Sequence, residues 1–194
     1  MKVNIMSVAY ERPIPIRILI DSFIVQTRED WKLTIIHDYK ASNEVHKTIG
    51  LYDDPRIVYK ESLKRLGAFG HPNRKQFLIE SKGAKDELVL LTNDDNYYVP
   101  VFIEKILDVC KSNTGMVYCD TVHSHFDYNV LKTIIRADGI DIGSFLVRGD
   151  IAKKVGFNHF QFNGDGFYAK ECALECIKRG LKIEYIPKPL FVHN

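Results

Sequence analysis

The chain has 194 residues, 45% of them apolar, and a formal net charge of +2 at pH 7. This length predicts one domain with a sizeable core, and the near-neutral charge argues against a nucleic-acid binder that works through bulk charge. No apolar run reaches the roughly eighteen residues that a membrane-spanning helix needs. The N-terminus is too short and too strand-like for a secretory signal, so we expect a soluble, cytoplasmic protein.

The cysteines indicate a reducing compartment. There are four: Cys110, Cys119, Cys172 and Cys176. The last two lie four residues apart on one expected helix face, which is a poor geometry for a disulfide. Because no Cys-x-x-Cys pair occurs, a structural zinc site is not expected. We interpret all four as small buried hydrophobic residues.

Strand and helix patterns alternate through the first 119 residues. Apolar, β-branched runs predict strands at 3–8, 33–36, 56–59, 88–92 and 116–119. Apolar residues at helical spacing predict helices at 13–27, 42–51, 73–82 and 100–110. A glycine-bearing loop is expected at 61–72. This alternation predicts an α/β fold with a doubly wound, mostly parallel sheet.

The pattern changes after residue 119. Two extended segments, 121–126 and 131–136, predict a small antiparallel excursion. Beyond them we expect a short helix at 150–155, a loop at 156–166, a helix from Asp165 to Arg179 that Gly180 ends, and a last strand at 181–186.

Polar side chains follow three of the expected parallel strands, at Tyr10–Arg12, Asp38 and Asn93–Asp95. The carboxyl ends of parallel strands meet at one edge of a sheet, where open α/β sheets bind their ligands. Asp94 and Asp95 are adjacent carboxylates that repel one another, so we expect a positive charge beside them. A hard divalent cation is the usual solution, and such a cation implies a substrate that carries phosphate.

The residue types at this edge suit a nucleotide. Tyr10 offers a ring face to a base, and Asp38 can accept a hydrogen bond from a base N–H. Asp94 can bond a ribose hydroxyl, and Asp95 can hold the cation on the phosphates. Each residue alone also fits a turn or a helix cap. Their joint placement favours the nucleotide site.

Several motifs, in their order, resemble the GT-A glycosyltransferases, specifically the inverting nucleotide-sugar enzymes of family 2. They are Ser7–Pro13 (SVAYERP), Ser22–Thr27 (SFIVQT), Ile35–Asp38 (IIHD), Asp53–Tyr59 (DDPRIVY), Arg74, Leu91–Pro100 (LTNDDNYYVP) and Ser144–Gly156 (SFLVRGDIAKKVG). The resemblance covers nearly the whole chain. The motifs are specific together, although each is weak alone.

The resemblance implies a GT-A fold in a single domain, 1–194, with a nucleotide-binding half at 1–119 and an acceptor and catalytic half at 120–194. It also implies that a sugar moves, with inversion, from a nucleoside-diphosphate sugar to the hydroxyl of a glycan or another acceptor. UDP is the expected nucleotide, and Mn²⁺ or Mg²⁺ is the expected cofactor. Many relatives carry further C-terminal helices or an extra domain, so a homo-oligomer is one way to complete the partner surfaces.

The resemblance assigns roles to individual residues. The donor-binding positions are Ala9, Tyr10, Glu11, Arg12, Asp38, Arg74, Asn93 and Asp94. Asp165 stands at the position of the family's general base, which deprotonates the acceptor hydroxyl. Asp95 and His193 are the expected cation ligands. From the residues alone, Asp165 could instead cap the helix that it opens, and His193 could be a surface residue.

Four positions depart from the family pattern. Ala9 replaces a proline, Glu11 an asparagine, and His37 and Asn93 each replace an aspartate. These changes leave open a binding protein that holds a nucleotide or glycan without turnover. A nucleotidyltransferase is a weaker alternative, because its glycine-rich opening loop has no counterpart in Ala9–Arg12.

Two further groups are open to two interpretations. His123 and His125 share one face of an expected strand, which suits a metal but is more often a half-exposed polar pair. Aromatic residues surround Asp165, at Phe157, Phe160, Phe162, Phe167 and Tyr168. They suit either a platform for an acceptor sugar or ordinary core packing.

Overall fold

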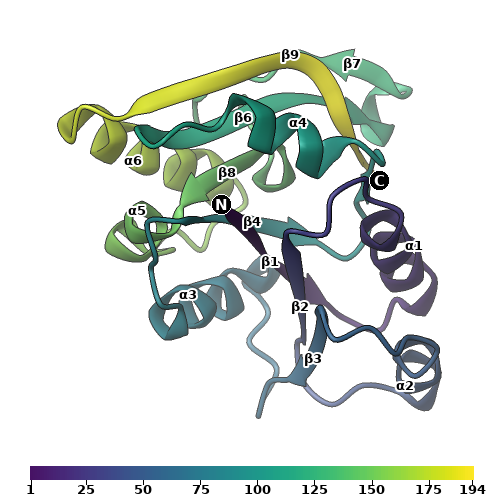
Figure 1. Ribbon diagram of the computed structural model, residues 1–194. Coiled ribbons are helices and arrows are strands. Elements are labelled where there is room, and N and C mark those ends of the chain that lie inside the picture. Colours follow the sequence, from purple (N-terminus) through teal and green to yellow (C-terminus); the bar gives the residue numbers. More distant parts are fainter.

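The computed structural model describes residues 1–194 and has a nine-stranded sheet with helices on both faces (Figure 1). The strands are β1 (Lys2–Ala9), β2 (Trp31–His37), β3 (Ile57–Glu61), β4 (Glu87–Asn93), β5 (Tyr97–Tyr98), β6 (Thr114–His123), β7 (Asn129–Leu131), β8 (Phe145–Arg148) and β9 (Lys182–His193). The helices are α1 (Pro13–Ile24), α2 (Asn43–Ile49), α3 (His71–Glu80), α4 (Phe102–Val109), α5 (Gly149–Val155) and α6 (Gly164–Lys178). Short 3₁₀ turns are η1 (Ala68–Gly70), η2 (Ser124–Phe126) and η3 (Ile142–Ser144).

The sheet order is β3-β2-β1-β4-β8-β6-β9-β5, and β7 pairs with β6. β1 pairs in parallel with β2 and β4, and β2 pairs in parallel with β3. β8 enters between β4 and β6, antiparallel to both, and β6 pairs in parallel with β9. The predicted α/β fold, with a mostly parallel sheet and an antiparallel excursion after residue 119, is confirmed. The excursion includes β8 as well as the β6–β7 hairpin.

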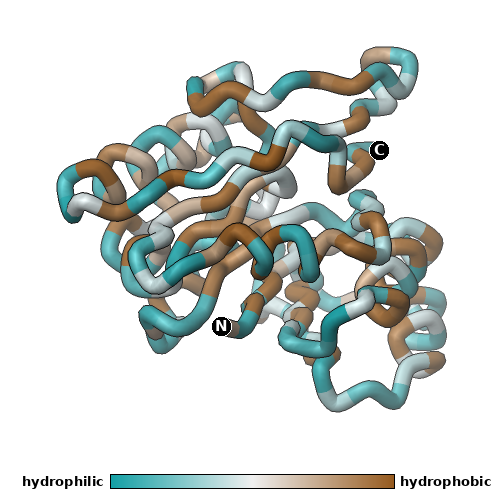
Figure 2. Tube along the Cα trace, turned by 45° about the horizontal axis from the view of Figure 1, so that its top comes forward, coloured by the Kyte–Doolittle hydropathy of each residue, from teal (hydrophilic) through white to brown (hydrophobic).

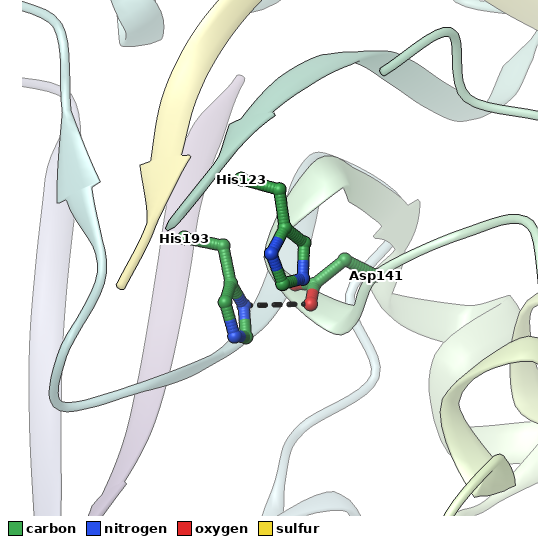
Figure 3. Close-up of side chains that lie close together, drawn as sticks. All are labelled: His123, Asp141 and His193. Carbon is green, nitrogen blue, oxygen red and sulfur yellow. Dashed lines mark ion pairs between the residues drawn. The ribbon is translucent and has the colours of Figure 1, made fainter. Parts of the chain in front are cut away.

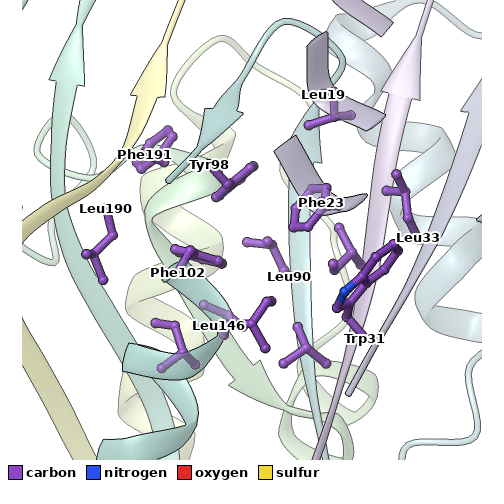
Figure 4. Close-up of a cluster of buried hydrophobic side chains, with 14 of the residues drawn as sticks. Leu19, Phe23, Trp31, Leu33, Leu90, Tyr98, Phe102, Leu146, Leu190 and Phe191 are labelled. Carbon is purple, nitrogen blue, oxygen red and sulfur yellow. The ribbon is translucent and has the colours of Figure 1, made fainter. Parts of the chain in front are cut away.

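The central strands are buried on both faces, because successive residues alternate between two cores. In β4, Leu90 joins one core, while its neighbours Val89 and Leu91 join the other. Figure 4 shows the first core, where the rings of Tyr98 and Phe102 lie 4.6 Å apart. Fully burying a side chain such as Phe102 contributes about 1.5–3 kcal/mol. In Figure 2 the hydrophobic stretches follow these buried strands, and hydrophilic stretches follow many of the connections.

The last strand is longer than predicted. β9 runs to His193 instead of ending at residue 186, although Pro187 and Pro189 lack N–H donors. The parallel ladder with β6 shifts its register on either side of Asp120, which lies opposite Pro189. Prolines are tolerated at such irregularities, so the strand continues and carries His193 to the ligand edge of the sheet.

The expected strand at 131–136 is wrong. β7 spans only Asn129–Leu131. The chain then leaves the ladder, because the N–H of Thr133 donates to the Asp120 carboxylate at 2.9 Å. A side chain therefore takes the hydrogen bond that a longer hairpin would have given to the backbone.

The remaining sequence expectations concern helices and cysteines. Ser42 caps α2, and its side chain accepts the N–H of Val45 at 3.5 Å. All four cysteines are free thiols; three are buried and Cys110 is half-buried. None of the helices is both long enough and apolar enough to cross a bilayer.

Candidate functional site

The carboxyl ends of β1, β2 and β4 lie side by side, since β1 pairs with both other strands. A cavity of about 360 Å³ lies at this edge. Its walls include five of the predicted donor-binding residues: Ala9, Tyr10, Arg12, Asp38 and Asn93. A larger groove, of about 1020 Å³, lies at the opposite edge, beside Val3, Trp31 and Glu87. Parallel sheets bind ligands at their carboxyl ends, so the smaller cavity is the candidate site.

Glu11 and His37, two departures from the family pattern, bond to one another. Glu11 has a left-handed φ of 50°, a conformation that asparagine adopts more readily. Its N–H donates to Nε2 of His37 at 2.9 Å, and its carboxylate accepts the N–H of Ser42 at 3.0 Å. The two changes therefore hold the same loop together, and neither side chain lines the cavity.

Arg12 neutralises the predicted carboxylate pair. Its guanidinium forms an ion pair with Asp94, and its Nη1 lies 2.6 Å from Oδ2 of Asp95. Burial raises the pKa of Asp94 to about 7, against the opposing effect of Arg12. Oδ1 of Asp95 is buried and has no hydrogen-bond partner. The chain itself thus supplies the positive charge expected here, and Asp95 keeps one oxygen free.

Asp38 anchors the segment that covers the cavity. Its carboxylate accepts the N–H groups of Leu66 at 2.9 Å and Gly67 at 2.8 Å, and Nδ2 of Asn73 at 2.8 Å. A carboxylate offers about four acceptor positions, so about one remains for a ligand. Contact between Asp38 and a base stays a prediction.

The segment that Asp38 anchors is strained. Its residues 67–70 all have positive φ, including the non-glycine residues Ala68 (46°) and Phe69 (56°). Each of the two non-glycine residues costs on the order of 1–3 kcal/mol, and such strain gathers at ligand clamps. Nearby, the guanidinium of Arg65 lies 4.0 Å from the Tyr10 ring centroid. Arg65, which the sequence did not single out, therefore covers the ring that was expected to face a base.

Arg74 is buried at the centre of the site and is only 1% exposed. Its Nη1 donates to the carbonyl of Phe69 and to Nδ1 of His71, both at 2.8 Å. Its Nη2 donates to Oδ1 of Asn93 and, at 3.4 Å, to the carbonyl of Thr92. Its Nε has no partner. These bonds connect α3 to the end of β4.

The charge of Arg74 is balanced by carboxylates that do not touch it. Burial lowers the pKa of Arg74, and the charges of Asp165, Asp141, Asp94 and Asp95 oppose that effect. Asn93 gives the guanidinium an acceptor without adding a further negative charge beside Asp94. This contact accounts for an amide at a position where the family often has aspartate.

Asp165 is the second residue of α6 and does not cap it. The N-cap position belongs to Asn163, which makes no capping bond, so the capping interpretation of Asp165 is wrong. Its side chain is 22% exposed, and Oδ1, which has no hydrogen-bond partner, lies 3.9 Å from Nδ1 of His71. Burial and the charge of Arg74 lower the pKa of His71 to about 4, so this contact is not an ion pair at neutral pH.

The environment makes Asp165 a stronger base than a surface carboxylate. Burial raises its pKa to about 6, and the charge of Asp141 adds to this shift while that of Arg74 opposes it. The group is therefore mostly ionised at pH 7 and still accepts a proton readily. Those are the two properties that a general base needs.

Two glycines fix the start of α6 against neighbouring backbone. A Cβ on Gly166 would overlap the carbonyl of Ala137, and one on Gly164 would overlap the carbonyl of His159. The helix can therefore approach closely enough to bring Asp165 to His71 only with glycine at both positions.

Gly166→Ala should displace Asp165 and destabilise the fold by about 1–3 kcal/mol, the usual cost of overpacking. Urea unfolding measures this loss. Gly50→Ala is the matched control, because Gly50 has a helical φ of −65° and its Cβ would lie 3.3 Å from a helix carbonyl. Equal stability of the two variants would contradict the close approach at Gly166.

The aromatic residues around Asp165 divide into two groups. Phe157 and Tyr168 are buried and pack with their ring centroids 5.0 Å apart, so core packing explains them. Phe162 is 83% exposed and lies edge-on to Phe69, with 5.7 Å between the centroids. An acceptor platform at this exposed pair stays a prediction.

His193 lies in a cluster that the sequence did not reveal. Its Nδ1 is 2.9 Å from Oδ2 of Asp141 (Figure 3), and its ring stacks on His123 with 4.1 Å between the centroids. His125 is exposed and lies outside this group. Asp141 precedes Gly143 and Ser144 in a turn-capping pattern, which carries no metal signal.

These residues fit a divalent cation. One ligand atom from each of His123, Asp141 and His193 lies within 4.8 Å of the others. Nδ1 of His193 and Oδ1 of Asp95 are buried without hydrogen-bond partners. Imidazole nitrogens and carboxylate oxygens are common ligands of divalent metals in proteins.

Solved structures match the fold, whereas neither a scan against protein-family models nor a search of curated proteins finds a match. S. aureus TarS, residues 1–349, matches with a TM-score of 0.77 at 11% identity, over 100% of this chain and 60% of that one. The TarS complex with UDP-GlcNAc matches with a TM-score of 0.76 at 13% identity, over 99% of this chain and 58% of that one. The mannosyltransferase PcManGT from Pyrobaculum calidifontis, in complex with GDP-Man and Mn²⁺, matches with a TM-score of 0.69 at 15% identity. The match covers 99% of this chain and 56% of that one.

The chain therefore has the GT-A fold of these glycosyltransferases, as its motifs imply. It spans 60% or less of the length of the matched chains. At such low identities the likeness defines the fold, and the activity has to be inferred from the site.

Proposed function

We propose that this chain transfers a sugar from a nucleoside-diphosphate sugar, with UDP as the expected nucleotide, to a hydroxyl of a glycan or another acceptor. The observation that carries the proposal is Asp165, a largely buried carboxylate with a free oxygen that lies 3.9 Å from His71. Nδ1 of His71 in turn accepts a hydrogen bond from Arg74. The sugar nucleotides bound in two of the matched structures support it.

In the proposed reaction, Asp165 takes the proton of the acceptor hydroxyl as that oxygen attacks the anomeric carbon. The bond from this carbon to the diphosphate oxygen breaks on the opposite face, so the configuration inverts and the nucleoside diphosphate leaves. Arg74 places a fixed positive charge at the same edge of the sheet. Asp95 and His193 are the residues expected to hold Mn²⁺ or Mg²⁺, which supplies Lewis-acid stabilisation of the leaving diphosphate.

Donor binding in this proposal requires two arginines to move. Arg12 must release a carboxylate before a ribose hydroxyl can reach Asp94, and its side chain is 47% exposed, so it can turn into solvent. Arg65 must leave the ring of Tyr10 before a base can stack there. Ala9 and Asp38 complete the walls of the proposed base pocket.

A protein that binds a nucleotide or glycan without turnover is the second candidate. The pairing of Arg12 with both Asp94 and Asp95 favours it, because carboxylates held by an arginine are less available to a cation. The free oxygen and the raised pKa of Asp165 favour the enzyme.

Nucleotide binding is the direct test of the proposal. We expect calorimetric titration of the chain with UDP, GDP and ADP to give the strongest binding for UDP, and binding to weaken when a chelator removes Mn²⁺. Failure of all three nucleotides to bind would contradict the proposed function. Equal binding of UDP with and without chelator would contradict the role of the cation alone.

The pH dependence of the activity should show the ionisation of Asp165 as a fall in rate at low pH. Because its pKa is raised to about 6, the basic form is lost as the pH falls through 6. We expect kcat/KM to fall about tenfold per pH unit below that value and to level off above it. Calorimetry of UDP across the same range controls for donor binding. A rate that stays constant down to pH 5 would remove Asp165 as the base.

A further inference from the structure

We infer that His123, Asp141 and His193 form a transition-metal site that does not depend on the Asp94–Asp95 pair. The two histidines are partners in the parallel ladder of β6 and β9. Laterally paired residues of neighbouring strands point to the same face of a sheet, and the two rings stack with an interplanar angle of 20°. Figure 3 shows both rings turned toward the Asp141 carboxylate.

The backbone orients Asp141 as a ligand. Its Oδ1 accepts the N–H of Gly143 at 2.8 Å, where Asp141 is the N-cap of η3. A Cβ on Gly143 would lie 2.8 Å from both the Asn96 amide and the Tyr98 hydroxyl, so η3 is pressed against the end of the sheet. Carboxylate ligands of metals are commonly fixed by such a bond on the second oxygen. The other oxygen, Oδ2, is left facing the imidazoles.

The contact between His193 and Asp141 brings two possible metal-ligand atoms together. Nδ1 of His193 lies 2.9 Å from Oδ2 of Asp141, and the two groups form an ion pair when the ring is protonated. Ligand atoms around an ion with bonds of about 2.1 Å lie about 3 Å or more apart. All three ligand atoms already lie within 4.8 Å of one another, so small side-chain movements complete the set.

The acidic pair at the end of β4 is not needed for this site. Arg12 contacts both carboxylates of that pair. Asp95 lies close enough for its charge to act on His193, and its one free oxygen could at most add a further ligand. The three residues of the C-terminal half are therefore the primary ligands.

The ligand set predicts which metals bind. Two imidazole nitrogens and one carboxylate favour later transition metals, with affinity rising from Mn²⁺ to Co²⁺ and Ni²⁺. Mg²⁺ and Ca²⁺ prefer all-oxygen sites. The inference that this cation lies beside the donor's diphosphate rests on the proposed function. Metal binding by the three residues does not, and it can be measured without a nucleotide.

Cobalt titration of the full chain, without nucleotide, tests the inference. We expect one Co²⁺ per chain, with a visible absorption band, and no displacement by excess Mg²⁺. Asp141→Asn and His123→Gln should each weaken Co²⁺ binding by roughly tenfold or more, since even removal of a residue that only supports a metal ligand typically costs 10–100-fold. His125→Gln is the matched control and should retain most of the affinity, whereas Asp95→Asn should weaken Co²⁺ binding less than Asp141→Asn does.

Three results would overturn the inference. The first is the absence of stoichiometric Co²⁺ binding to the folded wild type. The second is loss of binding in Asp95→Asn with normal binding in Asp141→Asn, which would place the metal on the acidic pair. The third is equal loss in His125→Gln and His123→Gln, which would indicate chelation by surface histidines. Circular dichroism verifies that each variant is folded. If Asp141→Asn does not fold, His123→Gln tests the site instead, because His123 is half-exposed and its replacement disturbs the core less.

Discussion

Asp165→Asn should slow sugar transfer by roughly 10²–10⁴-fold, the usual contribution of a general base, while nucleotide binding is retained. Asparagine keeps the shape of the side chain but cannot take the acceptor proton. Because burial raises the pKa of Asp165, the ionised carboxylate does not stabilise the fold at pH 7. The variant should therefore unfold at no lower temperature than the wild type, and a misfolded protein cannot explain its loss of rate.

Asp138→Asn is the matched control for this experiment. Asp138 is exposed and lies close to the start of α6, where it accepts Nδ2 of Asn163 at 3.4 Å. We expect its replacement to leave transfer unchanged. Normal turnover in Asp165→Asn would exclude that residue as the base, and equal losses in both variants would point to a general disturbance of α6.

Arg74→Met should lower the free energy of unfolding by about 1–3 kcal/mol, the cost of leaving a buried hydrogen-bonding group without its partner. The change leaves Oδ1 of Asn93 and the carbonyls of Phe69 and Thr92 without their donor. It also removes the charge that opposes the raised pKa of Asp165, so the acid limb of any remaining activity should move to higher pH.

Urea unfolding at pH 7 measures this effect against Arg17→Met. Arg17 is exposed and forms only a 3.7 Å surface pair with Asp21, and pairs of this kind contribute about 0–1 kcal/mol. A loss for Arg74→Met as small as that for Arg17→Met would show that the buried guanidinium does not hold α3 to β4.

The fold was largely predictable because its signals are local. Apolar runs such as Leu88–Leu91 indicate strands buried on both faces, and apolar residues at helical spacing indicate α1 and α4. The misjudged elements depend on distant contacts. β9 passes through two prolines because the register of β6 shifts opposite them, and β7 stops early because Asp120 captures the N–H of Thr133.

The candidate site was predictable where it follows from strand ends, and only there. Ala9, Tyr10, Arg12, Asp38 and Asn93 meet around one cavity because parallel strands end together. Asp141 escaped notice because it lies in an irregular segment, and only the tertiary packing of η3 brings it to His193. That Arg12 neutralises Asp94 and Asp95 was equally hidden, since residue identity does not show which charges pair in space.

A crystal structure of the chain with bound UDP would show directly where the donor binds. We expect the base in the cavity between Ala9 and Asp38, with Arg12 and Arg65 displaced. We expect the diphosphate between Arg74 and His193, with Asp165 facing the open space beyond it. UDP in the groove beside Trp31 at the opposite edge of the sheet, with Arg12 still on both carboxylates, would contradict the proposed donor site.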